Sequence, residues 1–251
     1  MTVQPLAIIT GGKRRLGAEI AAKLAGAGYA LALVSHLNKP PEASLAKSLE
    51  AHQTEWHAFT FDLSAGNPAD LISTISEHFG RMPDLLVNNA AMFGQDDWET
   101  MTLETLEAHF RLNLFSPLLL AQALVRASGA QMRPAIVNIL DQRITNPHRD
   151  QMSYTLSKQA LAASVRSMAA SFAGRARYNG VAPGLVISTD DYTLEQEARL
   201  AEMMPLGGLP SPSAVADAVY YLATAQDVTG QIIFVDGGAH LKSFDRDFMH
   251  L

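Results

Sequence analysis

Short apolar segments alternate with helix-like segments along the whole of this 251-residue chain. Each apolar segment contains branched side chains and ends near Gly, Asp, Asn or Pro, which is typical of strands buried on both faces of a parallel sheet. Since parallel strands need a crossover between them, the alternation predicts a doubly wound, seven-stranded parallel sheet with helices on both faces. The predicted strands are Leu6–Thr10, Leu31–Val34, Trp56–Phe61, Asp84–Asn88, Ala135–Leu140, Arg177–Ala182 and Gln231–Val235. The predicted helices are Ala18–Ala27, Glu42–Ala51, Pro68–Phe79, Leu103–Ala127 with a bend at Pro117, Gln151–Ala173, Glu195–Met204 and Ser213–Ala223.

No Pro- or Ser-rich linker and no internal repeat interrupts the alternation, so we expect a single α/β domain over residues 1–251. Apolar residues make up 48% of the chain, which is enough for a large core. The net charge of −6 argues against general nucleic-acid binding, because that needs a basic face. The absence of cysteine excludes disulfides, thiolate catalysis and cysteine-bound metals, and it fits a cytoplasmic protein.

We expect neither a secretory signal nor a membrane span. The apolar residues at 6–9 follow no basic segment and run directly into glycines, unlike a signal peptide. The longest apolar stretch, residues 112–125, is interrupted by polar residues and is too short for a bilayer. The eight histidines are scattered, without a pair at metal-ligand spacing backed by carboxylates, so we predict no catalytic metal.

A turn rich in glycine and basic residues, TGGKRRLG at residues 10–17, connects the first predicted strand to the first predicted helix. Glycines at this place let the backbone approach a pyrophosphate, whose charge the helix N-terminus stabilises. An ordinary glycine-rich turn is the alternative, but three adjacent basic residues have no evident structural purpose and favour a phosphate site. The residues expected to bind a cofactor here are Gly11, Lys13, Arg14, Arg15, Leu16 and Gly17.

The segment after the second predicted strand, residues 35–39, indicates which dinucleotide binds. An acidic residue here would bind the ribose 2′-hydroxyl of NAD, but the first acidic residue in this part of the chain is Glu42. His36, Asn38 and Lys39, together with the basic residues of the first turn, can instead surround a 2′-phosphate. This arrangement predicts NADP(H), although His36 as a plain surface residue is an alternative.

Tyr154 and Lys158 lie four residues apart in a predicted helix, so their side chains share one face. An ammonium beside a phenol favours the phenolate, so we expect the pKa of Tyr154 to fall towards neutral pH. Such a tyrosine can protonate a carbonyl or imine as hydride arrives. The spacing alone is a weak signal, because it also occurs in surface pairs of ordinary helices. Asp141 lies thirteen residues before the tyrosine (154 − 141).

Together with further motifs, these features resemble the short-chain dehydrogenase/reductase family, which has a Rossmann-type fold, over essentially the whole chain. The matching pieces are residues 10–17, Asp62, Asn88-Asn89-Ala90, Asn113, Tyr154 with Lys158, Pro183-Gly184 and Asp236-Gly237-Gly238. The resemblance implies a cofactor site that also includes Asp62, Leu63, Asn89, Ala90, Ala91, Tyr154, Lys158, Pro183, Gly184 and Leu185. It further implies that Asn113 positions a water for proton relay to Lys158. Lys158 would bind the nicotinamide ribose and Tyr154 would be the acid.

Two departures from the general family pattern are similar to the pteridine reductase branch, which includes bacterial dihydromonapterin and dihydrofolate reductases. Arg15 replaces the middle glycine of the first turn, and Asp141 stands where most members have the catalytic serine. Phe93, the run 183–185 and the pair Asp190-Asp191 also match that branch. Of the His-Arg-Ser set that the branch places around the 2′-phosphate, only the histidine is retained here.

The branch implies reduction of a dihydropterin or dihydrofolate to the tetrahydro form by NADPH. A carboxyl group can both donate to and accept from a pterin, whereas a serine hydroxyl suits a ketone. We therefore expect Asp141 and Tyr154 to manage the proton and Phe93 to stack on the pterin. A structural aspartate and a core phenylalanine are the respective alternatives. The expected substrate-binding residues are Arg15, Phe93, Asp141, Tyr154, Gly184 and Leu185.

Ala91 and the loops bordering the expected pocket do not indicate which substrate is bound. Pteridine reductases commonly have a serine at the position of Ala91, and a methyl group cannot make that hydrogen bond. The expected rim residues, which either select the substrate or are simply solvated, are Arg143, His148, Arg149, Asp190, Asp191 and Tyr192. The rival functions are a carbonyl or 3-oxoacyl reductase and a non-catalytic dinucleotide sensor. The family also implies a homotetramer, although the sequence does not distinguish a tetramer from a dimer.

Overall fold

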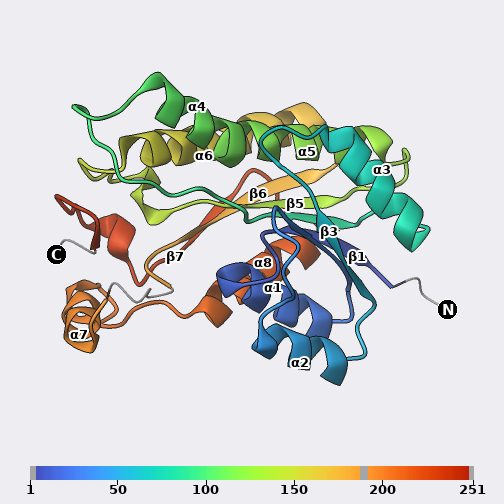
Figure 1. Cartoon of the computed structure of the whole chain (residues 1–251), viewed down its shortest axis with the longest axis horizontal. Helices are drawn as coiled ribbons and strands as arrows, with labels where there is room; N and C mark the ends of the chain where they lie inside the picture. The colour runs from blue at the N-terminus through green and yellow to red at the C-terminus, as the bar shows by residue number, and fades with distance from the viewer. Residues whose placement is uncertain (1–3, 187–191, 249–251) are drawn as a thin grey trace.

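Seven strands form one parallel sheet in the computed structural model, which describes residues 4–186 and 192–248 (Figure 1). They are β1 Leu6–Thr10, β2 Ala30–Ser35, β3 Trp56–Thr60, β4 Leu85–Asn88, β5 Ala135–Ile139, β6 Arg177–Pro183 and β7 Ile232–Val235. The spatial order is β3-β2-β1-β4-β5-β6-β7, which reverses between β1 and β4. Doubly wound sheets bind ligands at such a reversal, outside the carboxyl ends of the strands. The predicted Rossmann-type fold is confirmed.

Helices cover both faces of this sheet. They are α1 Arg15–Gly26, α2 Ala43–Ala51, α3 Pro68–Phe79, α4 Leu103–Phe110, α5 Ser116–Ala127, α6 Met152–Phe172, α7 Leu194–Met203 and α8 Pro212–Thr224. In Figure 1, α3, α4, α5 and α6 lie above the sheet, and α1, α2 and α8 lie below it. Helix α7 lies beyond one end of the sheet, near the C-terminus. Most helix ends agree with the predicted ones within one residue, and α1 begins three residues earlier than predicted.

The long helix predicted over residues 103–127 is interrupted. It consists of α4, the π-helical turn η1 Arg111–Phe115, and α5. The sequence predicts a bend at Pro117, but the irregular turn lies just before it, because proline lacks an N–H and its ring crowds the carbonyl of residue 113. A π turn widens the helix at this point, and such turns often occur at functional sites. Asn113, a predicted site residue, lies within it.

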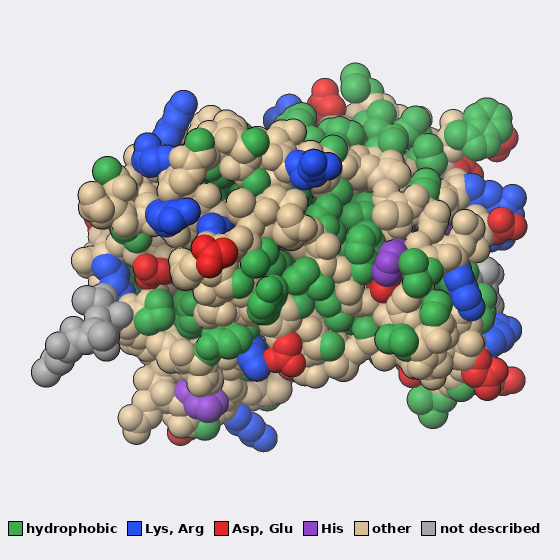
Figure 2. Space-filling model, turned by 180° about the vertical axis from the view of Figure 1, so that it is seen from behind, with side chains coloured by type: hydrophobic (Ala, Val, Ile, Leu, Met, Phe, Trp, Pro, Cys, Tyr) green, Lys and Arg blue, Asp and Glu red, His purple; other side chains and the backbone are tan. Residues whose placement is uncertain are grey.

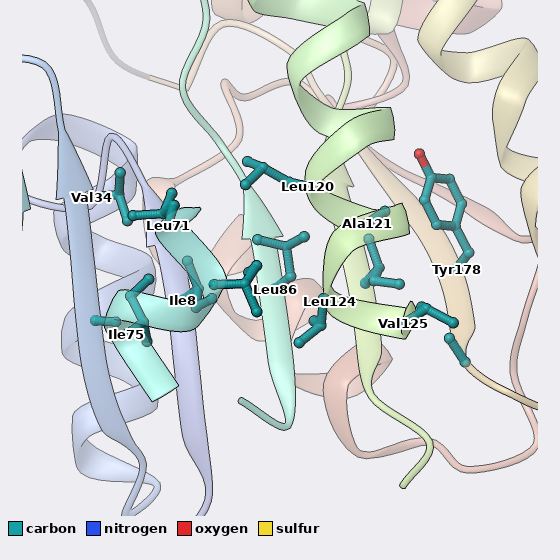
Figure 3. Close-up of a cluster of buried hydrophobic side chains, with 14 of the residues drawn as sticks. Ile8, Val34, Leu71, Ile75, Leu86, Leu120, Ala121, Leu124, Val125 and Tyr178 are labelled. Atoms are coloured by element: carbon teal, nitrogen blue, oxygen red, sulfur yellow. The ribbon is translucent and has the colours of Figure 1, made fainter. Parts of the chain in front are cut away.

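Two apolar layers attach the helices to the sheet. Figure 3 shows the layer beneath α3 and α5, where Leu71 and Leu124 of the helices lie against Ile8 and Leu86 of the strands. A second layer joins α1 and α8 to the opposite face of the sheet. Burying one such Leu or Ile side chain stabilises the fold by roughly 1.5–3 kcal/mol. These layers fix the carboxyl ends of β1, β4 and β5, where most predicted site residues lie.

On the face opposite to Figure 1, basic and acidic side chains are scattered around an area of apolar side chains (Figure 2). This mixed surface agrees with the net charge of −6. Among the described helices, none combines the length and apolarity needed to cross a bilayer. Within residues 4–186 and 192–248, no three His, Asp or Glu side chains are grouped as metal ligands.

Candidate active site

A cleft of about 850 Å³ lies at the carboxyl edge of the sheet, where the chain leaves β1, β2, β3 and β4. Most of the predicted cofactor residues line it, namely Gly11, Lys13, Arg14, Arg15, Leu16, Gly17, His36, Lys39, Asp62, Leu63, Asn89, Ala90 and Ala91. The remaining predicted cofactor residues do not line this cleft, namely the exposed Asn38 and Tyr154, Lys158, Pro183, Gly184 and Leu185. Glu42, the first acidic residue after β2, also lines the cleft.

Glycine is required where the first turn meets the end of β4. A Cβ added to Gly17 would come within 2.2 Å of the Gly11 carbonyl oxygen and 2.7 Å of Asn89 Nδ2. Gly11 itself has φ +65°, a left-handed conformation that favours glycine. The missing side chains let the turn pack directly on the end of β4, which brings the start of α1 to the cleft. The N–H of Arg15 donates to Glu42 Oε1 at 2.8 Å, so a phosphate group would have to displace this carboxylate to bind that N–H. A glycine-rich turn before a helix N-terminus is the arrangement that holds a dinucleotide in this kind of sheet.

The basic residues of this turn have different surroundings. Lys13 is buried, and its Nζ donates to the Leu37 and Lys39 carbonyl oxygens at 3.0 and 2.6 Å, so it ties the turn to the loop after β2. Arg14 and Arg15 are exposed. Arg15 has φ +52°, although this conformation costs an arginine about 1–2 kcal/mol. Backbone strain of this kind gathers at functional sites.

Asp141, Tyr154 and Lys158 are brought together beyond the end of β5. The Tyr154 hydroxyl donates to Asp141 Oδ2 at 2.9 Å. Lys158 is buried one helical turn further along α6, and its Nζ donates to the Ile139 carbonyl oxygen at 2.7 Å. The same Nζ lies 5.8 Å from the centroid of the Tyr154 ring. The three side chains that the sequence predicts as catalytic therefore lie close together; we call Asp141, Tyr154 and Lys158 the catalytic group.

The expected fall in the pKa of Tyr154 is wrong for this structure. Burial raises the pKa well above its ordinary value, and the Asp141 carboxylate, which accepts the hydroxyl proton, raises it further. Burial also lowers the pKa of Lys158 to about 8, with Asp141 acting in the opposite direction. The Lys158 ammonium lies 5.8 Å from the centroid of the Tyr154 ring, whereas the Asp141 carboxylate contacts the hydroxyl directly and has the larger effect. Tyr154 is therefore a neutral phenol at physiological pH.

Asn113 projects from the π turn towards the loop after β4. Its Oδ1 accepts from Met92 N at 2.8 Å, and its Nδ2 donates to the Met92 carbonyl oxygen and to Ser157 Oγ at 2.9 and 3.0 Å. These bonds fix the loop that carries Phe93 against the first turns of α6. The predicted role of Asn113 in positioning a water stays a prediction.

Arg143 and His148 are buried, whereas the sequence predicts both at the rim of the pocket. The 3-10 turn η2 Gln142–Ile144 follows β5 directly, and the Asp141 side chain caps it by accepting from Arg143 N at 2.9 Å. This turn directs the Arg143 side chain inward, where Nε lies 3.3 Å from Asp141 Oδ1. Burial, followed by the charge of Arg143, lowers the pKa of His148.

Phe93, another expected substrate residue, lies beside Tyr154 at the surface of the protein. Phe93 is 50% exposed and meets the Tyr154 ring edge-on, with 4.8 Å between the ring centroids, so core packing is not its role.

The remaining predicted substrate and rim residues lie after β6 and in the loop before α6. Pro183 ends β6, and Gly184 packs closely against Asp236. Leu185 packs beside α7, and Tyr192 is partly buried there. Arg149 is exposed. Asp190 and Asp191 lie outside the described residues.

Two carboxylates that sequence reasoning missed support α6. Asp96 accepts from Ser153 N at 3.1 Å and from the Ser153 hydroxyl, and its backbone oxygen accepts from Gln151 N at 2.6 Å. A carboxylate at a helix N-terminus complements the helix dipole. Asp247 contacts Arg143 from the C-terminal segment. No local pattern marks either residue, because their partners are 57 and 104 positions away.

The fold and site define a dinucleotide-dependent oxidoreductase, and comparisons with known proteins agree. A family model described as enoyl-(acyl carrier protein) reductase matches residues 11–240. The chain is 30% identical to pteridine reductase 1 of Leishmania tarentolae, covering 94% of this chain and 96% of the relative. It is 32% identical to carbonyl reductase family member 4 of Danio rerio, covering 94% and 98% respectively. FolM alternative dihydrofolate reductase 1 from Brucella suis, solved in complex with NADP, superposes with a TM-score of 0.86 at 28% identity over 98% of both chains.

The chain belongs to the short-chain dehydrogenase/reductase family, whose members use NAD or NADP as the hydride carrier. The predicted family is thereby confirmed, and so is the prediction of an enzyme. Similar identity to a pteridine reductase and to a carbonyl reductase means that the family alone does not decide the substrate.

Proposed function

We propose that this protein is an NADPH-dependent reductase of pterins, converting a dihydropterin or dihydrofolate to the tetrahydro form. The observation that carries the proposal is the Asp141 carboxylate, 2.9 Å from the Tyr154 hydroxyl at the position where most family members have a serine. A carboxylate accepts from the amino and N–H groups of a pterin, whereas the carbonyl oxygen of a ketone offers it no proton. The similarity to pteridine reductase 1 and to the FolM protein supports this substrate class.

NADP(H) is the proposed form of the cofactor. Arg14, Arg15, His36 and Lys39 border the cleft, so a 2′-phosphate would meet several basic groups there. Asp62 and Leu63 border the same cleft and would hold the adenine, while Asn89 and Ala90 would line the path towards the catalytic group. Bound NADPH supplies the hydride of the reaction. The residues of the chain bind it, position the substrate and move the proton.

Tyr154 is the proposed proton donor. Its raised pKa keeps a proton on Oη at neutral pH, and the hydrogen bond aims this proton at Asp141 Oδ2. A ring nitrogen of the substrate can take the proton from the Tyr154–Asp141 pair, directly or through water. Lys158, with a pKa of about 8, is largely protonated at pH 7 and balances the charge left behind. In this proposal it also holds the nicotinamide ribose.

Phe93 is the proposed aromatic wall of the substrate pocket. Half of its surface is exposed beside Tyr154, so a flat ring can lie on it within reach of the Asp141–Tyr154 pair. Offset stacking on an aromatic side chain contributes roughly 0.5–1.5 kcal/mol beyond the buried area. A phenylalanine exposed at this place is more useful to a planar heterocycle than to an aliphatic ketone.

A carbonyl reductase is the rival that keeps the fold and cofactor, and the similarity to carbonyl reductase family member 4 favours it. Asp141 weighs against it, because a carboxylate that accepts from Tyr154 and from the backbone of Arg143 does not donate to the carbonyl oxygen of a ketone, as a serine hydroxyl would. A non-catalytic dinucleotide sensor is the rival of another class. Such a protein would have no use for a buried tyrosine paired with a carboxylate.

Steady-state assays separate these functions. We expect NADPH oxidation with at least one of dihydrobiopterin, dihydromonapterin and dihydrofolate, and little with a 3-oxoacyl thioester or an aromatic ketone. Oxidation with the thioester or ketone alone would reject the pterin proposal in favour of the carbonyl rival. Tight NADPH binding without turnover of any of these substrates would favour the sensor.

We further propose that the protein is a homotetramer. Phe115, Leu119 and Leu156 expose large apolar side chains along η1, α5 and α6, and β7 is an unpaired edge of the sheet. Apolar surfaces of this kind are covered in symmetric assemblies. Sedimentation equilibrium should give four times the chain mass of 27.1 kDa, and a monomer mass would contradict the proposal.

A further inference from the structure

The C-terminal segment, residues 240–248, packs against the loop between Asp141 and α6. In Figure 1 this segment (red) lies at the end of the molecule where α6 begins. Asn146 Nδ2 donates to the His240 carbonyl oxygen at 2.6 Å, and Arg149 N donates to that of Asp245 at 3.4 Å. The loop that sets the position of the catalytic carboxylate is therefore covered by the end of the chain.

One buried guanidinium joins this segment to the catalytic group. Arg143 NH2 donates to Asp247 Oδ2, and NH1 donates to Gln151 Oε1. Its Nε lies 3.3 Å from Asp141 Oδ1, while Oδ2 of the same carboxylate accepts from Tyr154. Arg143 and Asp247 are 3% and 5% exposed, so water does not screen this pair. A single side chain thus links the tail, the catalytic carboxylate and the residue that precedes α6.

Gln151, which accepts a hydrogen bond from Arg143 NH1, has an unfavourable backbone conformation. It has φ +55° and is fully buried immediately before α6. A non-glycine residue keeps such a conformation only when its surroundings enforce it, at a cost of about 1–3 kcal/mol. Arg143 and the Asp96 backbone oxygen supply those surroundings. Tyr154, three residues further on, takes its position from this start of the helix.

The tail arrives at Arg143 in a defined position. Asp247 N donates to both carboxylate oxygens of Asp150, at 2.9 and 3.2 Å. Phe248 is buried in an apolar cluster with Leu200 and Met204. His148 packs edge-on against Phe248, with 5.8 Å between the ring centroids. The Asp247 carboxylate is therefore held by its own backbone and by its neighbour, and it is not a mobile terminal charge.

The Arg143 guanidinium is shared between two carboxylates, those of Asp141 and Asp247. Removing one partner of a buried ion pair leaves the other charge uncompensated, which is strongly unfavourable. Without Asp247, Arg143 has Asp141 as its one remaining carboxylate among the contacts of its guanidinium. Arg143 would then draw Asp141 towards itself and away from the Tyr154 hydroxyl. Asp247 prevents this by sharing the guanidinium.

We propose that Asp247 is a positioning residue of the active site, which acts through Arg143 to keep Asp141 on the Tyr154 hydroxyl. The C-terminal segment thus helps to position the catalytic group. This inference rests on the proposed roles of Asp141 and Tyr154, but it does not depend on the substrate being a pterin.

Asp247→Asn tests the inference, because the amide keeps the shape and removes the charge. We expect kcat to fall roughly 10- to 100-fold, as for a small displacement of catalytic groups. The Kd of NADPH should stay unchanged, because Asp247 does not line the cleft. Burial and the contact with Asp141 raise the pKa of Tyr154 and the charge of Asp247 raises it further, so tyrosinate should form at lower pH in the variant.

Matched variants separate positioning from loss of structure. Asp245→Asn removes the same charge two residues earlier, where the side chain is exposed, and should leave kcat and the pH profile as in the wild type. Asp247→Glu restores the charge and should recover part of the lost kcat. In an Arg143→Lys background, which keeps a cation but loses the guanidinium fork, Asp247→Asn should have a much smaller further effect.

The kinetic comparison uses whichever substrate the wild type reduces, so a ketone preference would reject the pterin proposal and still test this one. The absorbance of tyrosinate above pH 10, taken relative to Tyr154→Phe, gives a readout without turnover. More tyrosinate in Asp247→Asn than in Asp245→Asn supports the inference. Equal kcat, equal pH profiles and equal titrations in the two variants would overturn it.

Discussion

The cofactor cleft and the catalytic group lie at the same edge of the sheet, but they are built differently. The cleft is formed by turns that directly follow β1 to β4, and its tightest point is a junction of backbone atoms at Gly11 and Gly17. The catalytic group consists of buried or partly buried side chains, and the charged contacts around it extend from Asp141 to Asp247, 106 positions apart (247 − 141). A substitution that adds side-chain volume should therefore impair cofactor binding in the cleft. A substitution that removes a charge or a transferable proton should impair the catalytic group.

Tyr154→Phe should have the largest effect, and it should be confined to the catalytic group. Loss of the hydroxyl removes the proton donor, so kcat should fall by about 10²- to 10⁴-fold. NADPH affinity, measured by fluorescence titration, should change little, because Tyr154 is not among the residues that line the cleft. Tyr221→Phe on the exposed side of α8 is the matched control. An unaltered kcat in Tyr154→Phe would point to a protein that does not use this tyrosine.

Gly17→Ala is the corresponding test of the cleft. The new methyl group would lie 2.2 Å from the Gly11 carbonyl oxygen, so the turn must move, at a cost of about 1–3 kcal/mol. We expect a roughly 10-fold or larger rise in the Kd of NADPH, and a smaller change in kcat at saturating cofactor. Gly129→Ala makes the same substitution in open space and serves as the control. Equal cofactor affinity in the two variants would show that the junction does not shape the cleft.

The fold and the cleft could be predicted because their signals are local. A strand such as Leu6–Thr10 shows its burial in its own residues, and the glycines of the turn lie within eight positions of one another. The catalytic charges could be predicted only in part. Tyr154, Lys158 and Asp141 follow known spacings, but the inward direction of Arg143 depends on the distant Asp247.

The pKa of Tyr154 shows why spacing alone was insufficient. One helical turn correctly places Lys158 near the ring, and from this the sequence predicts a lowered pKa. The sequence does not reveal that the phenol is buried, nor that the nearest charge to its hydroxyl is the Asp141 carboxylate. Burial and this contact both favour the neutral phenol, and they outweigh the ammonium.

The pH dependence of activity sharpens the account of the catalytic group. Burial lowers the pKa of Lys158 to about 8 from 10.5, so kcat/KM should decline as the pH rises through about 8 and the ammonium is lost. Between these two values the unfolded chain binds more protons than the folded protein, so the free energy of unfolding should rise with pH. Lys158→Arg keeps the charge and should move the decline in kcat/KM to higher pH. A decline at the same pH in both proteins would assign it to another group.

Arg15→Gly should have the smallest effect and should act only on the cleft. Glycine adopts φ +52° without strain, so the variant should be about 1 kcal/mol more stable, which raises the Tm by roughly 2–4 °C. It should also bind NADPH more weakly, because a cation at the cleft is lost. Arg14→Gly removes a neighbouring charge from an extended residue, with φ −152°, and should not raise the Tm. Equal Tm values in the two variants would contradict the claim that the backbone at Arg15 is strained.

The substrate preference of Asp141→Ser tests the central claim most directly. The claim is that a carboxylate at this position, held between Tyr154 and Arg143, selects a nitrogen heterocycle over a ketone. We predict that the ratio of kcat/KM for a dihydropterin to kcat/KM for a ketone falls by about 10²-fold in the variant, as for loss of one well-placed polar contact in the transition state. An unchanged ratio, with the fold intact by circular dichroism, would contradict the claim.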